Sequence, residues 1–558
     1  MSPSTSSRMS LSPSAHVDPF CREHLPPADD WPDLLLDDLP YPDRLNCATA
    51  LLDDVIAEHG GDRPCLRVPG EQPWTYDRLR ATADQVAHVL TAECGIVPGN
   101  RVLLRGPNNP WLVACWFGVL KAGAVAVTTM PMLRSRELRD IHEIARIDLA
   151  LSDHRFLDDL RAAALDGVPT IAYGGPGEDD LSVRAAAHPE RFADVATAAD
   201  DVALLAFTSG TTGRPKATMH FHRDVLAIAD TFSRHVVRPT ADDVVSGTPP
   251  LGFTFGLGGL LVFPLRVGAS TLLIEKATPA ELAGHIAEHR VTVCFTAPTA
   301  YRAMLTAAEL SELCTLRRAV SAGEHLDETT WRQFHAATGL ALIDGIGSTE
   351  MLHVFIAAAD EDIRPGATGR AVPGYQARIV DEEGHPVPDG TPGRLAVRGP
   401  TGCRYLDDPR QRVYVQGGWN VTGDTFTRDA DGYFWYHARN DDMIVSSGYN
   451  IAGPEVEEAV RSHPDVVDCA VVGVPDPARG QLVAAYVVAR AGAPTGADAV
   501  AALQSHVKAT IAPYKYPRVV EFVAELPRTA TGKLQRFRLR ERAAGRNAGQ
   551  GPGTPRPA

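Results

Sequence analysis

Two hydrophobic patterns alternate along the first half of the chain. Between residues 75 and 93 apolar side chains recur every three or four positions, the spacing of an amphipathic helix. Residues 101–105 and 122–127 are short apolar runs typical of buried strands, and residues 109–121 between them predict a second helix. Strand–helix–strand alternation of this kind indicates βαβ units built on parallel sheets.

The same alternation returns at residues 291–295 and 317–321, so the parallel-sheet prediction extends through the middle of the chain. The most apolar stretch, residues 111–130, is interrupted by Lys121 and two glycines. This pattern favours a buried helix followed by a buried strand over a membrane span.

A polar segment at residues 439–442 separates this pattern from a compact α+β pattern. Beyond it we expect helices at 453–462 and 498–510 and strands at 466–474, 482–488 and 518–523. The chain is therefore predicted to be an α/β protein with two domains. Its predicted parts are a disordered tail at 1–19, a large domain at 20–440, a small domain at 441–543 and a disordered tail at 544–558.

Composition and charge narrow the function classes. The 558 residues are 44% hydrophobic and 22% charged, as in globular proteins, and the net charge of −15 argues against a nucleic-acid binder. The nine cysteines form no C-x-x-C pair, so we expect neither a zinc site nor a disulfide framework. The first residues lack the apolar segment of a signal peptide, and a cytoplasmic protein is expected.

The most informative segment is residues 205–217, where an apolar run leads into a Gly/Ser/Thr loop closed by a lysine. Glycines permit turns that aim N–H groups inward, hydroxyls add donors and lysine adds charge, so the loop is a candidate polyphosphate cradle. Its spacing is not that of a Walker A loop, and taken alone a solvated loop is an equal alternative. The candidate ligands are Thr208, Ser209, Gly210, Thr211, Thr212, Gly213 and Lys216.

Five further segments accompany this loop, at 321–326, 344–350, 419–424, 436–441 and 526–533. Together with the loop they resemble, in order and spacing, the motifs of the acyl-adenylate-forming (AMP-dependent synthetase/ligase) superfamily. The resemblance extends over residues 20–543. It implies an adenylating N-terminal domain with βαβ-type sheets and a small β-barrel subdomain, followed by a small mobile C-terminal lid.

The resemblance implies a division of labour at the site. Glu350 is expected to bind Mg²⁺, a cation that prefers oxygen ligands, and Thr349 to donate to phosphates beside the loop. Lys533 would place a positive charge between the substrate carboxylate and the α-phosphate, where negative charge gathers in the transition state. Glu350, Thr349 and Lys533 are thus the candidate catalytic residues.

The remaining nucleotide contacts follow from the same motifs. We expect Asp424 to accept hydrogen bonds from the ribose hydroxyls. We expect Arg439 to donate to the same sugar from its planar guanidinium group. Glu324 is expected to orient a turn on the adenine side more than to do chemistry. The adenine-side candidates are Gly323, Glu324, Asp344, Gly345, Ile346 and Gly347.

Forming an acyl-adenylate and attacking it with a thiol are different reactions at the same carbon. The resemblance implies that the small domain takes a different pose for each of them. Asp441 matches the hinge position of the family, and Gly448 would let a pantetheine arm pass close to the backbone. Many family members carry lysine where this chain has Val445 and Ala484. These departures weaken the case for coenzyme A as the acceptor.

Four further segments suggest which carboxylic acid is the substrate. They resemble the benzoate and 2-aminobenzoate CoA-ligase branch of the family and lie at 20–27, 249–259, 345–355 and 452–456. Phe253 and Phe255 are candidates for the walls of a flat aromatic slot, and His353 for a contact with the carboxylate or an ortho substituent. Ordinary core aromatics and a structural histidine remain the alternatives.

The leading hypothesis is ATP-dependent conversion of an aromatic acid to its adenylate and then to a coenzyme A thioester, with ATP, Mg²⁺ and coenzyme A as cofactors. One alternative changes the acceptor to a carrier-protein thiol, an amine, or nitrite in a diazotisation. Another is a silent nucleotide-binding paralogue, against which the presence of Lys533, Glu350, Asp424 and Arg439 argues. No nucleic-acid or membrane partner is expected.

Overall fold

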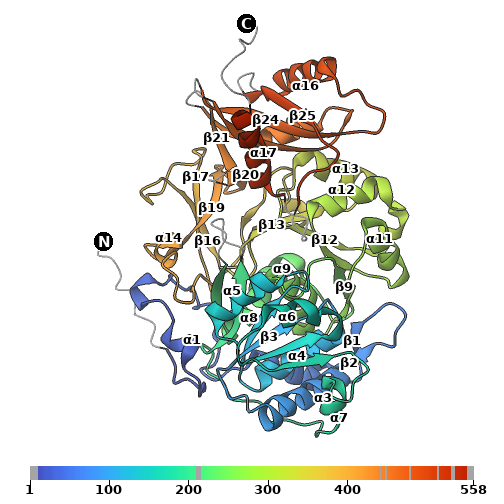
Figure 1. Cartoon of the computed structure of the whole chain (residues 1–558), viewed down its shortest axis with the longest axis vertical. Helices are drawn as coiled ribbons and strands as arrows, with labels where there is room; N and C mark the ends of the chain where they lie inside the picture. The colour runs from blue at the N-terminus through green and yellow to red at the C-terminus, as the bar shows by residue number, and fades with distance from the viewer. Residues whose placement is uncertain are drawn as a thin grey trace.

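The computed structural model describes residues 11–208, 215–439, 442–446, 449–476, 479–511, 515–528 and 534–549. Four sheets organise these residues, and Figure 1 shows the C-terminal elements above a larger body formed by the rest of the chain. None of the described helices is long and apolar enough to cross a membrane.

The first sheet has six strands in the order β6-β5-β3-β4-β7-β8, parallel except for the edge strand β8. Its strands are β3 (Arg101–Arg105), β4 (Val125–Thr129), β5 (Leu149–Asp153), β6 (Thr170–Tyr173), β7 (Val202–Thr208) and β8 (Lys216–Phe221). Its helices are α3 (Tyr76–His88), α4 (Pro110–Lys121), α5 (Ser135–Ala145), α6 (Leu157–Ala163), α7 (Leu181–Ala186) and α8 (His222–Ile228).

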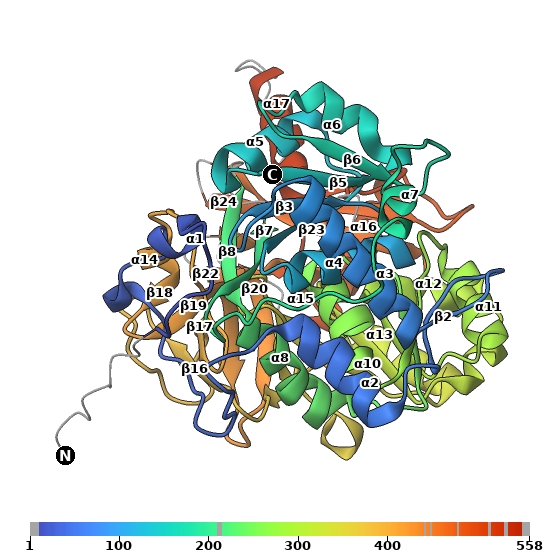
Figure 2. The same cartoon turned by 90° about the horizontal axis from the view of Figure 1, so that it is seen from below.

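Alternate strand residues of this sheet enter two different cores. Leu104 packs with the cluster that includes α3 and α4, whereas Leu103 packs with α5 and α6, so helices cover both faces (Figure 2). Asn109 caps α4 by accepting from the Leu112 N–H at 2.9 Å. The helix–strand prediction for residues 109–127 is confirmed, although β4 begins only at Val125 because the preceding turn contains Gly123 at φ +70°.

The second sheet has nine strands in the order β15-β14-β13-β12-β11-β9-β10-β1-β2, parallel in its middle. The strands are β1 (Pro64–Arg67), β2 (Trp74–Thr75), β9 (Val244–Gly247), β10 (Ser270–Leu272), β11 (Val293–Thr296), β12 (Arg318–Ala322), β13 (Leu342–Gly347), β14 (Val354–Ala357) and β15 (Arg370–Ala371). The helices nearby are α2 (Asp54–His59), α9 (Thr254–Leu257), α10 (Phe263–Arg266), α11 (Pro279–Glu288), α12 (Pro298–Ala307) and α13 (Glu328–Thr338). The strands predicted near 293 and 318 are confirmed.

The third sheet is antiparallel and forms the small β-subdomain. It contains β16 (Gln376–Val380), β17 (Gly393–Arg398), β18 (Val415–Gln416), β19 (Trp419–Arg428) and β20 (Phe434–Arg439), with α14 (Gln411–Tyr414). Because β19 pairs with both β17 and β20, it links the subdomain to the segment that leads toward the C-terminal part.

The fourth sheet belongs to the small C-terminal domain. It contains β21 (Met443–Ser446), β22 (Tyr449–Ala452), β23 (Val466–Asp476), β24 (Gly480–Ala489) and β25 (Val519–Phe522), with α15 (Gly453–Arg461), α16 (Ala497–Thr510) and α17 (Arg536–Gly549). All five elements predicted between residues 453 and 523 are present, within a few residues of their expected ends.

The predicted tails need correction at both ends. Residues 11–19 are held in place: the Ser14 hydroxyl donates to Asp201 Oδ1 at 2.5 Å and the Val17 N–H to the Pro98 carbonyl at 2.9 Å, ahead of α1 (Phe20–Glu23). Buried carboxylates need such donors, so this polar segment is ordered despite its composition. At the other end α17 continues to Gly549, since good helix formers precede its glycines.

Candidate active site at the hairpin between β7 and β8

The predicted phosphate loop connects two antiparallel strands. Thr208 at the end of β7 pairs with Lys216 at the start of β8, so both flanks of the loop are fixed by a strand ladder. Residues 209–213 themselves lie outside the described part of the chain. The cradle is therefore framed by a β-hairpin rather than by a strand and a helix N-terminus.

Lys216 lies beside Glu350 and Tyr405. Its Nζ is 3.0 Å from Glu350 Oε1 and also hydrogen-bonds to the Tyr405 hydroxyl, which donates to the same carboxylate oxygen at 2.5 Å. Glu350 is 7% exposed, so its charge is compensated almost without water. Burial, followed by the neighbouring carboxylate, raises the pKa of Tyr405 and keeps it a neutral donor.

Two tyrosines of this cluster were not predicted from the sequence. Lys216 Nζ stands 4.4 Å from the ring centroid of Tyr405 and 5.5 Å from that of Tyr414, and the Tyr414 hydroxyl is 3.2 Å from Ser348 Oγ. Both tyrosines come from the segment that precedes β19, far from the loop in sequence. Their only sequence signal is proximity to the ribose motif, which does not predict a contact with Lys216.

A buried histidine supports the neighbouring Thr349. The His220 Nε2–H donates to the Thr349 carbonyl at 2.8 Å, which leaves Nδ1 unprotonated. Burial lowers the pKa of His220 to about 3, so the ring is neutral at pH 7. Behind it lies the fully buried pair of Arg404 and Asp224, and the Oδ2 atom of Asp224 is 3.9 Å from His220 Nδ1. His220, to which sequence reasoning gave no role, thus positions the backbone next to Glu350.

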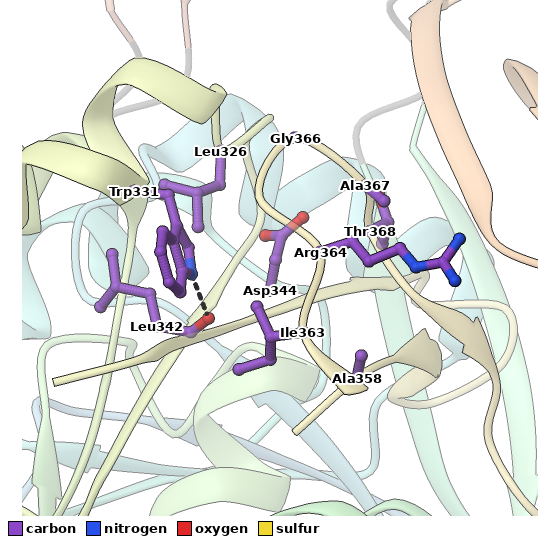
Figure 3. Close-up of a pocket in the computed structure, with 10 residues that line it drawn as sticks. All are labelled: Leu326, Trp331, Leu342, Asp344, Ala358, Ile363, Arg364, Gly366, Ala367 and Thr368. Carbon is purple, nitrogen blue, oxygen red and sulfur yellow. Dashed lines mark hydrogen bonds between the residues drawn. The ribbon is translucent and has the colours of Figure 1, made fainter. Parts of the chain in front are cut away.

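The adenine-side motif ends β13 and faces a small cavity of about 10 Å³. Figure 3 shows the Asp344 carboxyl pointing toward it, opposite Trp331, whose indole N–H donates to the Leu342 carbonyl at 2.9 Å. Burial raises the pKa of Asp344 well above its ordinary value. The cavity is lined by Leu326, Trp331, Leu342, Asp344, Ala358, Ile363, Arg364, Gly366, Ala367 and Thr368.

The glycines of this motif are required because neighbouring atoms pack closely against their backbone. A Cβ on Gly345 would lie 2.8 Å from Val354 Cγ1, and one on Gly347 would lie 2.6 Å from the His353 carbonyl oxygen. Gly323 adopts φ +90° in the turn after β12, which positions Glu324 beside the C-terminal domain. Ile346 lies between the two glycines, half-buried against the core.

The two ribose candidates lie on adjacent strands. Asp424 of β19 is the register partner of Arg439 of β20, and the Asp424 N–H donates to Thr422 Oγ1 at 3.3 Å. The side chain of Arg439 lies outside the described part of the structure. The register places the two residues directly opposite each other.

The acid-side candidates sit in an apolar cluster. His353 is 3% exposed, and its ring centroid lies 4.6 Å from Phe263, 5.3 Å from Phe232 and 5.6 Å from Phe255. Burial lowers the pKa of His353 to about 3. Phe255 is 9% exposed and also packs edge-on against Phe295, 5.7 Å between centroids, whereas Phe253 is only partly buried.

His353 also has unused polar capacity. Its Nε2 is 3.4 Å from the Phe255 carbonyl, and its Nδ1 is buried with no hydrogen-bond partner among the described residues. A Cβ on Gly258 would approach His353 Cδ2 to 2.3 Å, so the α9 segment closes tightly on this ring. Only residues 348–353 separate β13 from β14, and this connection carries both Glu350 and His353.

Three predicted residues, Lys533, Asp441 and Gly448, lie outside the described part of the chain. The neck of the Lys533 loop is described: Arg528 and Leu534 pair as an antiparallel bridge, and the Gln535 N–H donates to the Pro527 carbonyl at 2.8 Å. Ala484 is fully buried in an apolar cluster of the C-terminal domain.

Comparison with known proteins agrees with this geometry. Residues 52–404 match the AMP-binding enzyme family and residues 455–533 its C-terminal domain, and the chain belongs to that family. It is an AMP-forming ligase of the benzoate/2-aminobenzoate-CoA ligase-like branch.

Three relatives illustrate the match. Benzoate–CoA ligase of Thauera aromatica is 35% identical over 90% of this chain and 97% of its own. Anthranilate CoA ligase AuaEII in complex with anthranoyl-AMP superposes with a TM-score of 0.86 at 33% identity, over 91% of this chain and 99% of its own. MatB from Rhodopseudomonas palustris, 29% identical over 89% of this chain and 99% of its own, gives 0.82 when ATP-bound and 0.74 as the apo form.

Proposed function

We propose that this enzyme activates an aromatic carboxylic acid of the benzoate or 2-aminobenzoate type with ATP, releasing pyrophosphate, and transfers the acyl group from the adenylate to coenzyme A. We assign adenylation to residues 20–440 and the lid role to residues 441–543. All nine cysteines are free, which supports a reducing, cytoplasmic setting.

The observation that carries the proposal is the contact of the half-buried Lys216 with the buried Glu350 and Tyr405 at the base of the hairpin. An anionic acid and a polyphosphate repel each other, so their reaction needs fixed positive charge and metal ligands in a site with little water. Lys216 supplies the charge. Glu350 supplies a hard oxygen ligand, and Mg²⁺ needs only one or two such carboxylates because phosphates and water complete its shell.

A flat aromatic acid suits the other end of the site. The ring cluster of Phe232, Phe255, Phe263 and His353 is apolar and uncharged, which disfavours a second ionised group on the substrate. An ortho-amino group could donate to the unpartnered Nδ1 of His353. Relatives named for benzoate and anthranilate support the same class of acid.

Pyrophosphate release across a panel of acids, with and without coenzyme A, tests this function. We expect benzoate and 2-aminobenzoate to exceed cyclohexanecarboxylate and octanoate in kcat/KM, and coenzyme A to be needed for turnover. Aromatic contacts add about 0.5–1.5 kcal/mol each, which corresponds to at most roughly tenfold per contact. Preference for octanoate would overturn the aromatic assignment. Turnover with an amine or a carrier-protein thiol but not with coenzyme A would overturn the acceptor.

A further inference from the structure

Six charged side chains alternate across the boundary between the two domains. In Figure 1 helices α12 and α13 lie below the C-terminal elements. Ion pairs connect residues of this part of the larger domain to residues of the C-terminal domain. The larger domain contributes Arg302, Glu324 and Asp327, and the smaller contributes Arg461, Asp468 and Arg528.

Each charge faces an opposite one across the boundary. Arg528 Nη1 is 3.4 Å from Glu324 Oε1, while its Nη2 donates to Asp468 Oδ2 at 2.7 Å within its own domain. Asp468 Oδ1 is in turn 3.9 Å from Arg302 Nη1. Arg528 therefore joins a carboxylate of each domain.

A second contact supports the first. Asp327 Oδ2 accepts from Arg302 at 2.9 Å and from Arg461 of α15 at 3.4 Å, with only 2% of its side chain exposed. Burial opposes the ionisation of Asp327, yet Arg461 and Arg302 hold its pKa below the ordinary value. Isolated surface ion pairs contribute little, but partly buried charges in a shared network are screened less by water and salt.

Arg528 lies next to the loop that carries Lys533. Arg528 stands five positions before Lys533 and forms, with Leu534, the neck of the loop that carries this lysine. Glu324 follows β12 directly, on the adenine side of the site. The Arg528–Glu324 contact therefore ties the neck of this loop to the predicted adenine side of the larger domain.

We propose that Arg528 is a positioning residue for adenylation: by pairing with Asp468 and Glu324 together, it holds the small domain against the larger domain in the pose of the first step. This inference rests on the proposed function, because it assumes that Lys533 acts in adenylate formation. The Arg461–Asp327 contact secures the same pose from α15. In the second half-reaction this network must open, so its contribution belongs to the first step alone.

The two half-reactions of Arg528→Gln separate this role from general damage. We expect ATP–pyrophosphate exchange to fall about tenfold, while thioester formation from supplied acyl-adenylate and coenzyme A stays within twofold of wild type. Glu324→Gln should lower pyrophosphate exchange by a similar factor, and exchange by the double variant should be no slower than by the slower single variant, because the two residues share one contact. Arg542→Gln, which removes a 2.5 Å pair with Glu521 inside the small domain, is the matched control and should leave exchange unchanged.

The relative position of the two domains can be measured without an activity assay. A donor dye on the exposed Cys314 and an acceptor on Thr495→Cys, exposed before α16, report the separation of the domains by energy transfer. Arg528→Gln should broaden the transfer distribution relative to its parent, and Arg542→Gln should not. Unchanged transfer, or exchange within twofold of wild type, would overturn the inference. If the wild type exchanges pyrophosphate with no acid, the proposed function fails, and energy transfer still decides the role of Arg528.

Discussion

The proposed phosphate side and the proposed acid side of the site differ in charge, although Glu350 on the first and His353 on the second are both buried. On the phosphate side Lys216, Glu350 and Tyr405 bring charges together out of water and compensate them within 3.0 Å. On the acid side His353 is equally buried but uncharged, among phenylalanines. A substrate with a carboxylate at one end and a flat ring at the other matches this polarity. This difference shows that burial alone does not distinguish the two sides. They are distinguished by whether their buried groups are charged.

The largest effect is expected from removing charge on the phosphate side. Glu350→Gln keeps the shape but loses the anionic oxygen ligand and leaves Lys216 uncompensated. We expect ATP–pyrophosphate exchange to fall about 10²–10³-fold, as when one preorganised electrostatic group is removed. Glu361→Gln, an exposed carboxylate on a short 3₁₀ turn, is the control. Retention of exchange within threefold would show that Glu350 is structural.

A smaller effect is expected from crowding the acid side. A Cβ on Gly258 would lie 2.3 Å from His353 Cδ2, and overpacking of this kind costs about 1–3 kcal/mol. Gly258→Ala should therefore lower kcat/KM for benzoate by roughly 5–150-fold, by the conversion of about 1.36 kcal/mol per tenfold, with the KM for ATP unchanged. Gly284→Ala on α11, which meets no atom within 4 Å, should leave both values unaltered. Equal changes for acid and ATP would argue against separate sides.

His353→Phe sharpens the comparison further, because it keeps the ring and removes both nitrogens. One hydrogen bond contributes about 0.5–1.5 kcal/mol, so kcat/KM for 2-aminobenzoate should fall roughly 3–10-fold. Benzoate, which has no ortho donor, serves as the internal control and should stay within twofold. Parallel losses for both acids would make His353 a packing residue only.

The last expected effect concerns stability rather than activity, and it depends on pH. His220 has its pKa lowered from 6.5 to about 3 by burial, so the unfolded chain binds its proton at a higher pH than the folded one. The stabilisation is full above pH 6.5 and is lost as the pH falls toward 3, with a slope of at most about 1.4 kcal/mol per pH unit. Replacing His220 by Gln should flatten the fall of the unfolding temperature between pH 6.5 and 4.5.

Local patterns determined most of the elements. The apolar periodicity near residue 80, the asparagine–proline start of α4 and the five C-terminal elements all reappear in the structure. Side-chain period and capping act over a few residues, so a sequence contains them directly. The N-terminal segment was mispredicted because its order comes from Asp201 and Pro98, partners that a local window does not include.

The sequence by itself determined the chemistry available: a hydroxyl-rich loop with Lys216, a carboxylate at Glu350 and a lysine loop near the C-terminus. Only the tertiary structure decided which groups meet. It brought Tyr405 to Lys216 and Glu350, set His220 behind Thr349, and joined Arg528 to Glu324 across the domain boundary. These contacts span between 55 and 204 positions. Contacts of that range depend on how sheets and domains pack, and no local periodicity encodes them.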